Sequence, residues 1–450
     1  MNENNNRAQF TTRLGVIATT VGSAVGLGNI WRFPYEAGTH GGGAFLFTYL
    51  CFIFLFGIPI LCAEFMIGRQ TRSNIFGAFR KLRSSGQWHW VGYIGIGASL
   101  MILSFYSVVA GWTLEYLYQS ITGALNFSSA EEFHKQFSTF STGNWRPLMW
   151  TIIFLLLNFV IVIRGVQKGI ERMSNIMMPC LFLILIIFCI NSLLMPRAID
   201  GLKFLFTPDF SKINSSVMIG AMGQAFFSLS LGLGTMLTYG SYFSNKTRIV
   251  RSATTTALLD TSVAILAGVI IFPAVFTFGV SPAQGPTLVF EILPNIFNQL
   301  PGSIIWSSLF FFLLFIASLS STISMSEVSI AFFTEEKKMS RKKATWLNTG
   351  IALVFGSICA LSFGSLSGMT IFGHTIFSLF DYVSSNILLP AGGMFIAFFA
   401  GWLLDRKIIK SQLTNDGDVK VHVMKIIIFS LKYIAPIGIL LVFLSLINLI

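Results

Sequence analysis

The stretch from Gly22 to Asn29 reads GSAVGLGN and interrupts a segment that otherwise has the apolar character of a membrane-spanning helix. Its three glycines and one asparagine are poor helix formers. Because backbone at membrane depth finds no water to hydrogen-bond, an interruption is tolerated only where protein groups or a cavity satisfy it. The stretch therefore predicts a helix that stops and restarts partway across the bilayer.

The rest of the chain has the composition of a polytopic membrane protein. Hydrophobic residues make up 54% of the 450 residues and charged residues only 11%, whereas roughly 25% of an ordinary soluble domain is charged. Apolar segments long enough to cross a hydrocarbon core of ~30 Å recur along the sequence, and we expect no cleavable signal peptide before the first. We expect eleven spans, at about 11–37, 41–69, 90–123, 147–164, 169–194, 214–242, 251–278, 302–333, 345–363, 373–403 and 424–448.

The distribution of basic residues predicts the orientation. With the N-terminus inside, 23 of the 30 Lys and Arg residues fall in inside loops, 5 fall in outside loops and 2 fall within spans. Cytoplasmic loops carry such an excess, so we expect a cytoplasmic N-terminus and, with an odd number of spans, an external C-terminus. The net charge of +12 then reflects topology, and no nucleic-acid partner is expected. The interval 285–300, punctuated by prolines, is expected to be an outside loop with short helical pieces.

One short pattern occurs twice. Val25-Gly-Leu-Gly28 lies in the first span and Leu231-Gly-Leu-Gly234 in the sixth, with five spans in each block. Because five is odd, the two blocks have opposite orientations, and paired glycine-interrupted spans of inverted halves indicate a binding site near the midplane. Glycine pairs also serve helix packing, which one pair alone would not distinguish. We expect a single transporter domain over 1–450, with repeat 1 at about 11–194, repeat 2 at about 214–403 and an extra helix at 424–448.

Broken helices offer binding groups of both polarities. A break frees carbonyls, which attract cations, and N–H groups, which attract anions, so a site with both suits a zwitterion beside a metal ion. Asn29, Ser228 and the run Ser320–Thr322 add neutral oxygens, which suit a hard cation. The five cysteines lie in apolar segments without metal or disulfide spacing. No catalytic triad or carboxylate pair stands out, so we do not expect an enzyme.

Residues 13–45, RLGVIATTVGSAVGLGNIWRFPYEAGTHGGGAF, resemble the first-span signature of the sodium-coupled neurotransmitter and amino-acid symporters. Further matches are GQAFFSLSLGLG (223–234), ASLSST (317–322) and SFYSVVAGW (104–112), so the resemblance covers essentially the whole chain. It implies an all-α membrane fold with an inverted five-plus-five repeat, the leucine-transporter fold, and alternating access. It also implies two sodium sites, no organic cofactor and a bacterial cytoplasmic membrane. Eleven spans depart from the twelve common in the family and resemble its shorter bacterial members.

The resemblance implies two sets of sodium ligands. The first combines the Ala24 carbonyl, Asn29, Ser228 and the substrate carboxylate. Asp260 either ligates this first sodium or supplies the negative charge for which many animal relatives need chloride, and we expect chloride-independent transport. A serine in a span often bonds its own helix, which is the structural alternative for each serine in these sets. The second set comprises the carbonyls of Gly22, Val25 and Ala317 with the hydroxyls of Ser320 and Ser321.

The resemblance also implies the substrate class. Monoamine transporters of this family carry an aspartate at the position of Gly26, so here the substrate should bring its own carboxylate, as an amino acid does. Tyr106 matches the tyrosine that hydrogen-bonds that carboxylate, and Phe227 matches the aromatic lid. The apolar pocket favours a hydrophobic side chain, aromatic ones included. The expected substrate-binding residues are Ala24, Gly26, Leu27, Gly28, Ile102, Tyr106, Phe227, Ser228, Ser230, Leu233, Ser321 and Met325.

Charged residues match the gates of the family. Arg32 and Asp381 correspond to an outer gate pair, and Arg7 and Glu335, with Tyr242 beside them, to an inner one, for which plain loop charge is the alternative. In the fifth span, Gly169 and Pro179 match a spacing at which short-chain relatives unwind the helix, although a generic kink would look the same. Glu64 matches an acid that supports the unwound backbone.

Two functions other than symport are compatible with the same residues. A sodium-conducting channel would also suit broken helices lined with oxygen. A non-transporting amino-acid sensor of the same fold would retain the ligands. The expected partners are an amino-acid substrate, sodium ions and the lipid bilayer.

Overall fold

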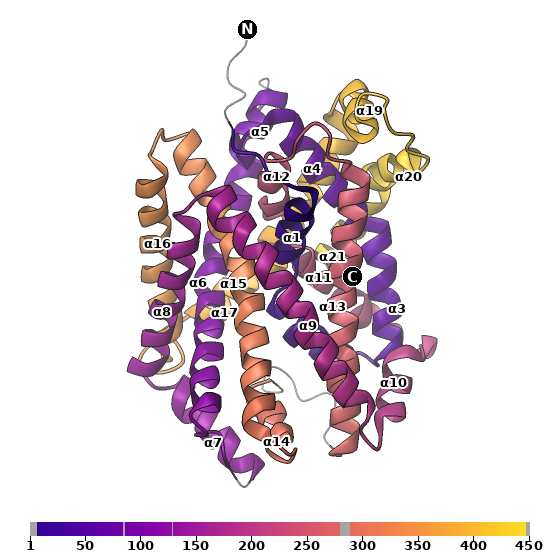
Figure 1. Cartoon of the computed structure of the whole chain (residues 1–450). Helices are drawn as coiled ribbons and strands as arrows, with labels where there is room; N and C mark the ends of the chain where they lie inside the picture. Colours follow the sequence, from indigo (N-terminus) through magenta and orange to yellow (C-terminus); the bar gives the residue numbers. More distant parts are fainter. Residues whose placement is uncertain (1–6, 84–85, 128, 280–288, 447–450) are drawn as a thin grey trace.

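The computed structural model is a bundle of long helices that run between two ends of the molecule (Figure 1). Among the described helices, nine are long and apolar enough to cross a membrane, or ten if the bent pair α1 (Arg13–Ala24) and η1–α2 (Gly28–Thr39) counts as one span. The nearly all-helical architecture is the one predicted. The structure describes residues 7–83, 86–127, 129–279 and 289–446.

The interruption at GSAVGLGN is present. Helix α1 begins after Thr12, whose hydroxyl accepts a hydrogen bond from the Gly15 N–H, and it ends at Val25, where the backbone becomes extended. The chain then re-enters helix as a π-helical turn, η1 (Gly28–Arg32), followed by α2 (Phe33–Thr39), and the two halves of the span meet at 52°.

A second interruption separates α11 (Ser215–Ser228) from α12 (Thr235–Gly240). At 1.5 Å per residue the two pieces are about 21 Å and about 9 Å long, so neither spans a membrane by itself. Gly232 and Gly234 have φ angles of +80° and +79°, a region that glycine enters without strain. The repeated glycine pattern therefore marks a second break at the predicted position.

The other spans of the first block are continuous or contain one π-helical turn, and their ends lie within a few residues of those expected. They are α3 (Gly43–Phe52) with η2 (Ile53–Gly57) and α4 (Ile58–Thr71), α6 (Trp90–Ile121), α8 (Trp145–Val162), and η3 (Val166–Glu171) with α9 (Arg172–Leu193).

The later spans follow the same plan. They are α13 (Ile249–Thr277), α15 (Ser303–Glu335), α16 (Arg341–Leu361), then α17 (Ile376–Tyr382) with η6 (Val383–Leu388), α18 (Leu389–Phe398) and η7 (Phe399–Leu403), and finally α20 (Met424–Phe429) with η8 (Ser430–Ile434) and α21 (Ala435–Leu446).

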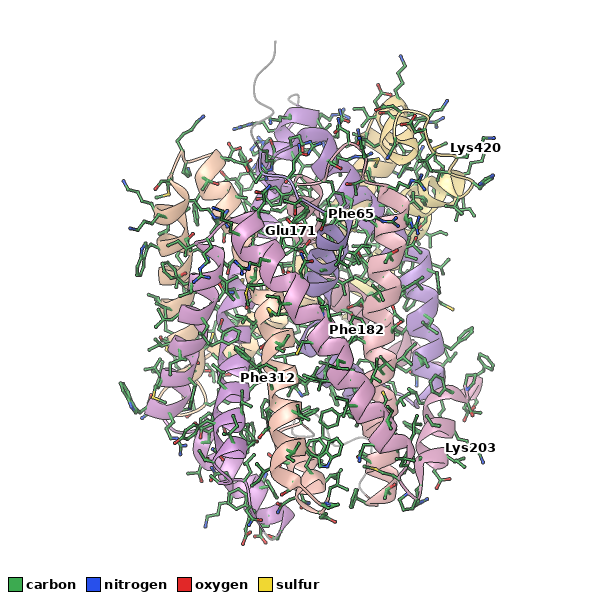
Figure 2. The ribbon with its side chains drawn as sticks, viewed as in Figure 1. Phe65, Glu171, Phe182, Lys203, Phe312 and Lys420 are labelled. Carbon is green, nitrogen blue, oxygen red and sulfur yellow. The ribbon has the colours of Figure 1, made fainter. Side chains whose placement is uncertain are left out.

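The outer surface of the bundle is apolar along its middle. Helix α9 exposes Leu183, Ile186 and Ile190, as expected of a helix that faces lipid. In Figure 2, Phe182 and Phe312 lie along the flank, whereas Lys203 and Lys420 lie near opposite ends. The surface thus has an apolar band between two charged ends.

Most short elements at the ends were not predicted. A hairpin of β1 (Thr370–Ile371) and β2 (His374–Thr375) occupies the expected start of the tenth span, which therefore begins at Ile376. Of the loop expected at 285–300, residues 285–288 lie outside the described residues, and the rest contains a short helix as expected. The short helices are α5 (Ile75–Leu82), α7 (Ala130–Ser141), α10 (Ala198–Phe206), η4 (Phe210–Lys212), α14 (Ile292–Asn298) and α19 (Arg406–Thr414).

Candidate substrate and sodium site

The first break meets α6 at a hydrogen bond. The Leu27 N–H donates to the hydroxyl oxygen of Tyr106 over 2.8 Å, and the Gly26 N–H donates to Asn29 Oδ1 over 3.0 Å. All four residues are buried. The structure thus places the predicted carboxylate-binding tyrosine directly against freed N–H groups, which is an arrangement that favours an anionic group.

A narrow cavity lies between the two broken helices. Ten of the twelve residues predicted to bind substrate line it. Of the other two, Leu27 lines a neighbouring cavity and Ser228 belongs to the candidate sodium ligands described below. Leu389 of α18 was not predicted, because no motif surrounds it. The lining residues are Ala24, Gly26, Gly28, Ile102, Tyr106, Phe227, Ser230, Leu233, Ser321, Met325 and Leu389.

The surroundings of Gly26 leave no room for a side chain at this position. A Cβ atom built at this position would lie 2.5 Å from Ser321 Oγ and 2.7 Å from the Tyr106 hydroxyl oxygen. Both distances are shorter than an ordinary van der Waals contact, so any larger residue would displace one of these two side chains.

The candidate ligands of the first sodium form a buried cluster from three elements. Asn29 Nδ2 donates to Ser228 Oγ over 2.9 Å and to Asp260 Oδ1 over 2.8 Å, and Ser228 Oγ donates to Asp260 Oδ2 over 2.6 Å. Asp260 makes no ion pair with a described residue. A buried carboxylate without a cationic partner is costly, and a bound cation would compensate its charge.

Residues that were not predicted complete this cluster. The Tyr49 hydroxyl lies 3.4 Å from Ser228 Oγ, and Gln224 Nε2 donates to the Gly28 carbonyl over 2.8 Å. Gln224 belongs to the motif GQAFFS, so it could have been predicted from the sequence. Nothing around Tyr49 distinguishes it from other buried aromatic residues.

The candidate ligands of the second sodium lie where α1 meets α15. Ser321 Oγ donates to the Val25 carbonyl over 3.0 Å, and Ser320 Oγ lies 3.4 Å from the same oxygen and 2.9 Å from the Ala317 carbonyl. A Cβ atom at Gly22 would lie 3.5 Å from the Ser320 Cβ. The five predicted residues are therefore neighbours, and the bond from Ser320 to Ala317 also fits the structural role of a serine in its own helix.

The predicted outer pair is not formed in this structure. Arg32 and Asp381 line the same cavity, which adjoins the narrow one across Phe227 and Tyr106. Arg32 pairs instead with Glu36, one turn away on its own helix, at 3.4 Å, and its guanidinium lies 5.0 Å from the centre of the Phe227 ring. Phe227 thus separates the narrow cavity from the outer one.

The predicted inner residues are brought together. Arg7 forms an ion pair with Glu335, and its guanidinium lies 4.7 Å from the centre of the Tyr242 ring. The Tyr242 hydroxyl donates to Glu327 over 2.7 Å, a buried acid that was not predicted. The end of the bundle that carries the N-terminus is therefore closed by contacts among the segment before α1, the segment after α12 and the end of α15.

The fifth span is helical throughout the predicted hinge. Gly169 lies in η3 and Pro179 lies inside α9. Between them, the Glu171 carboxylate accepts hydrogen bonds from the Thr11 N–H at 3.0 Å and the Thr12 N–H at 3.3 Å, at the start of α1. Glu171 was not predicted, and Figure 2 shows it near the N-terminal end.

Glu64 supports the second break, as expected from its place in the second span. Its two carboxylate oxygens accept hydrogen bonds from the Gly232 N–H at 2.8 Å and the Leu237 N–H at 3.2 Å. Gly232 lies in the break and Leu237 in the first turn of α12, so this buried acceptor satisfies N–H groups that lack a helical partner.

Fold and site together define a membrane transporter built around two broken helices. The chain belongs to the sodium:neurotransmitter symporter family, whose model matches residues 7–143 and 138–450. It is 38% identical to the uncharacterized sodium-dependent transporter YhdH of Bacillus subtilis, over 98% of each chain, and 35% identical to an uncharacterized sodium-dependent transporter of Haemophilus influenzae, also over 98% of each. The crystal structure of MhsT in complex with L-phenylalanine matches 98% of this chain and 100% of its own, with 46% identity and a TM-score of 0.91.

These likenesses support the predicted fold and class. The nearly all-helical architecture with two interrupted spans is that of the leucine-transporter fold. The protein is a sodium-dependent, multi-pass membrane transporter, its relatives are transporters and not enzymes, and its bacterial relatives indicate the inner membrane.

Proposed function

We propose that this protein imports a hydrophobic L-amino acid, aromatic ones included, together with sodium. The observation that carries the proposal is the narrow cavity, where Gly26 leaves no carboxylate for a lone amine and where Ile102, Leu233, Met325 and Leu389 provide an apolar wall. The similar transporter MhsT was crystallised with L-phenylalanine, which is a substrate of this chemical class.

In this proposal the ends of the broken helices hold the charged part of the substrate. The carboxylate would accept hydrogen bonds from freed N–H groups and from Tyr106, and it would complete the first sodium site with the Ala24 carbonyl, Asn29 and Ser228. The second sodium would bind the carbonyls and hydroxyls where α1 meets α15. Neutral oxygens with a fixed carboxylate nearby suit a hard monovalent cation.

Asp260 would make chloride unnecessary. Its carboxylate accepts hydrogen bonds from both Asn29 and Ser228, so it would place its negative charge beside the first sodium site. Whether Asp260 also ligates the ion is a separate question, which a substitution described below addresses. We propose no organic cofactor.

Transport would proceed by alternating access within one domain formed by the two inverted repeats and the extra helix. The outer path would close over Phe227 when Arg32 approaches Asp381. The inner path would open when the contacts of Arg7 with Glu335 and Tyr242 separate, and the segment from Gly169 to Pro179 would unwind to admit water to the second sodium. The N-terminus would be cytoplasmic and the C-terminus external.

Sodium gradients supply enough free energy for this task. Each ion that enters down ~100 mV releases about 2.3 kcal/mol, and a tenfold concentration ratio adds about 1.4 kcal/mol. Two ions would therefore drive roughly 7 kcal/mol of uphill uptake, and one ion about half as much.

Uptake of radiolabelled amino acids into proteoliposomes tests the proposal. We expect accumulation with external sodium and none with choline, and competition by phenylalanine, leucine, tyrosine or tryptophan but not by dopamine. Sodium current without accumulation would favour the channel, and sodium-dependent binding without uptake would favour the sensor. Dopamine as the best competitor would contradict the substrate class.

The proposed independence of uptake from chloride is tested by replacing chloride with gluconate. Uptake in sodium gluconate should equal uptake in sodium chloride. A collapse of uptake in gluconate would show that the fixed carboxylate does not replace chloride.

A further inference from the structure

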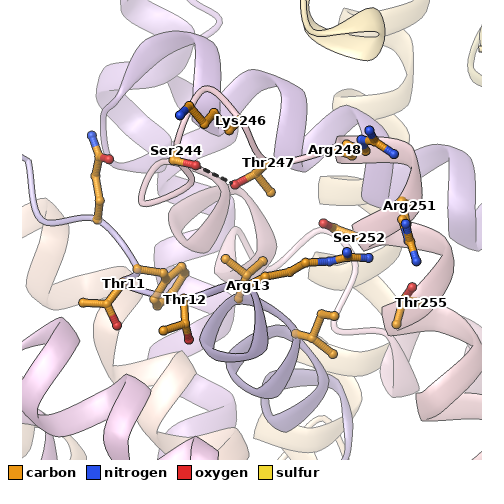
Figure 3. A pocket seen from close by; sticks show the side chains of 14 residues that line it. Thr11, Thr12, Arg13, Ser244, Lys246, Thr247, Arg248, Arg251, Ser252 and Thr255 are labelled. Carbon is orange, nitrogen blue, oxygen red and sulfur yellow. Dashed lines mark hydrogen bonds between the residues drawn. The ribbon is translucent and has the colours of Figure 1, made fainter. Parts of the chain in front are cut away.

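A third cavity is lined by basic side chains and lies between the start of α1 and the start of α13 (Figure 3). Arg13 comes from α1, whereas Lys246, Arg248 and Arg251 come from α13 and the loop before it. The cavity shares no residue with the narrow one between the broken helices. It lies at the end of the molecule from which the N-terminus extends, and the symport mechanism does not use it.

The four basic groups lack partners within the described part of the chain. None of them makes an ion pair or a side-chain hydrogen bond there, although Arg and Lys residues form seven ion pairs elsewhere in the described chain. Glu171 hydrogen-bonds two lining residues, Thr11 and Thr12, but its oxygens are occupied by their N–H groups. Like charges around one cavity repel each other, and a bound anion would remove that repulsion.

Further donors point to the same anion. The hydroxyls of Ser252 and Thr255 line the cavity and make no side-chain hydrogen bond to a described residue. Helix α13 begins after Arg248, which provides no side-chain cap, so the first N–H groups of a 29-residue helix also remain open on this side. The N-terminus of a long helix attracts negative charge.

The other wall of the cavity is apolar. Val16 and Ile17 line it one turn beyond Arg13, and Figure 3 shows the Arg13 side chain extended from α1 toward Ser252. Cations and hydroxyls next to an apolar wall suit an amphiphile, with its charged group among the arginines and its chains along the helices. Free phosphate would use only the polar part.

We propose that this cavity binds a phosphate group, and that the phosphate is the headgroup of an anionic phospholipid. Basic pockets between membrane helices recognise such headgroups. Because Arg13 lies on the half-helix α1 and the other cations lie on α13 or in the loop before it, a bound phosphate would link these two parts and favour the closed arrangement in which Arg7 pairs with Glu335. Phosphate binding in this cavity depends neither on the proposed amino-acid substrate nor on the proposed membrane orientation.

Thermal unfolding of the purified full chain in neutral detergent tests binding. Short-chain phosphatidylglycerol should raise the unfolding temperature at concentrations at least tenfold lower than short-chain phosphatidylcholine does. Inorganic phosphate should compete with phosphatidylglycerol but bind more weakly. If phosphate alone stabilises as well as the lipid does, free phosphate is the ligand. If phosphatidylglycerol and phosphatidylcholine act alike, the proposal is wrong.

Substitutions separate this site from general surface charge. The triple variant Arg13→Gln, Arg248→Gln, Arg251→Gln should weaken phosphatidylglycerol binding at least tenfold, and Arg248→Gln alone should give a smaller loss. The matched control removes three exposed cations elsewhere, as Lys342→Gln, Lys343→Gln, Lys425→Gln, and should bind within twofold of the unmodified protein. An equal loss in the control would show general attraction, and an unchanged triple variant would exclude the cavity.

Discussion

At the scale of single residues, Gly26 has the most direct effect on the substrate. Gly26→Ala would place a methyl group against Ser321 and the Tyr106 hydroxyl. We expect KM for amino-acid uptake to rise at least ~10-fold, or about 1.4 kcal/mol. The matched control is Gly97→Ala in α6, since a Cβ there meets no atom within 4 Å, and its uptake should be unchanged. Equal kinetics of the two variants would contradict the proposed pocket.

Asp260 permits an experiment that separates its two candidate roles. Asp260→Ser removes the only carboxylate that hydrogen-bonds both Asn29 and Ser228 in the described structure. We expect sodium-dependent uptake in gluconate to fall at least ~10-fold, because a buried sodium loses its compensating charge. Restored uptake in chloride would assign Asp260 the charge role, and no restoration would assign it a ligand role. Unchanged uptake in gluconate would remove both.

We expect the thermal stability of the protein to depend on pH through His40, at the end opposite the N-terminus. A hydrogen bond with Glu36 raises the pKa of His40 above its usual value, and the ring also lies 3.2 Å from the Ser216 hydroxyl of α11. A raised pKa adds stability below about pH 6.5 that is lost as pH rises through the folded value. We expect the unfolding temperature to fall by a few degrees from pH 6 to 8. His40→Asn and Glu36→Gln should both lack this component.

The positions of candidate site residues were predictable where a motif contained them. Asn29, Ser228 and Ser321 belong to contiguous signatures, and the structure brings each to its expected neighbours. Leu389, Glu171 and Glu327 were missed, because a lone leucine, or an acid near a span end, has no local pattern that distinguishes it. Their roles depend on which distant backbone or side chain lies opposite them, and tertiary packing alone determines that.

At the scale of secondary-structure elements, η3 and the first part of α9 contain the candidate hinge. Pro179 removes one helical hydrogen bond within α9, so Pro179→Ala should stabilise the helix and slow unwinding. We expect sodium release, followed by stopped-flow fluorescence of a sodium-sensitive dye, to be at least ~3-fold slower, since a restored helical bond contributes about 0.5–1.5 kcal/mol. Pro436→Ala in the extra helix is the matched control. Unchanged kinetics in Pro179→Ala would remove the hinge.

Long elements were predictable and short ones were not. An apolar run of about 20 residues has few alternatives to a membrane helix, so each expected span matches one or more consecutive helices within a few residues of its predicted ends, although α11 and α12 of the sixth are each too short to cross a membrane. Helices α5 and α19 are short, amphipathic and rich in charge, which makes them look like loops to a search for apolar runs. The hairpin at 370–375 has only two residues per strand, too few to show an alternating pattern.

At the scale of the whole molecule, sodium and substrate should stabilise the protein jointly. A ligand at ~100 times its dissociation constant adds about 2.7 kcal/mol to the free energy of unfolding. We expect phenylalanine to raise the unfolding temperature in sodium chloride and to leave it nearly unchanged in potassium chloride. An equal rise in both salts would mean that the substrate site forms without sodium, and would contradict the shared role of the broken helices.

The inner pair is assembled at the end with the N-terminus, and the cavity lined by Arg32 and Asp381 is retained at the other end. Arg7, Glu335 and Tyr242 are in contact, whereas Arg32 and Asp381 are apart. Sequence motifs identified both groups of residues, but they could not tell which one is assembled, because both arrangements use the same side chains.

The Glu171 carboxylate has a mechanical consequence. From the fifth span, it accepts hydrogen bonds from two successive N–H groups at the start of α1. Helix α1 therefore cannot move away from a rigid fifth span unless both hydrogen bonds break first. If these hydrogen bonds persist, unwinding of the fifth span would move the start of α1 with it. Release of the second sodium and opening of the inner gate would then occur in one step.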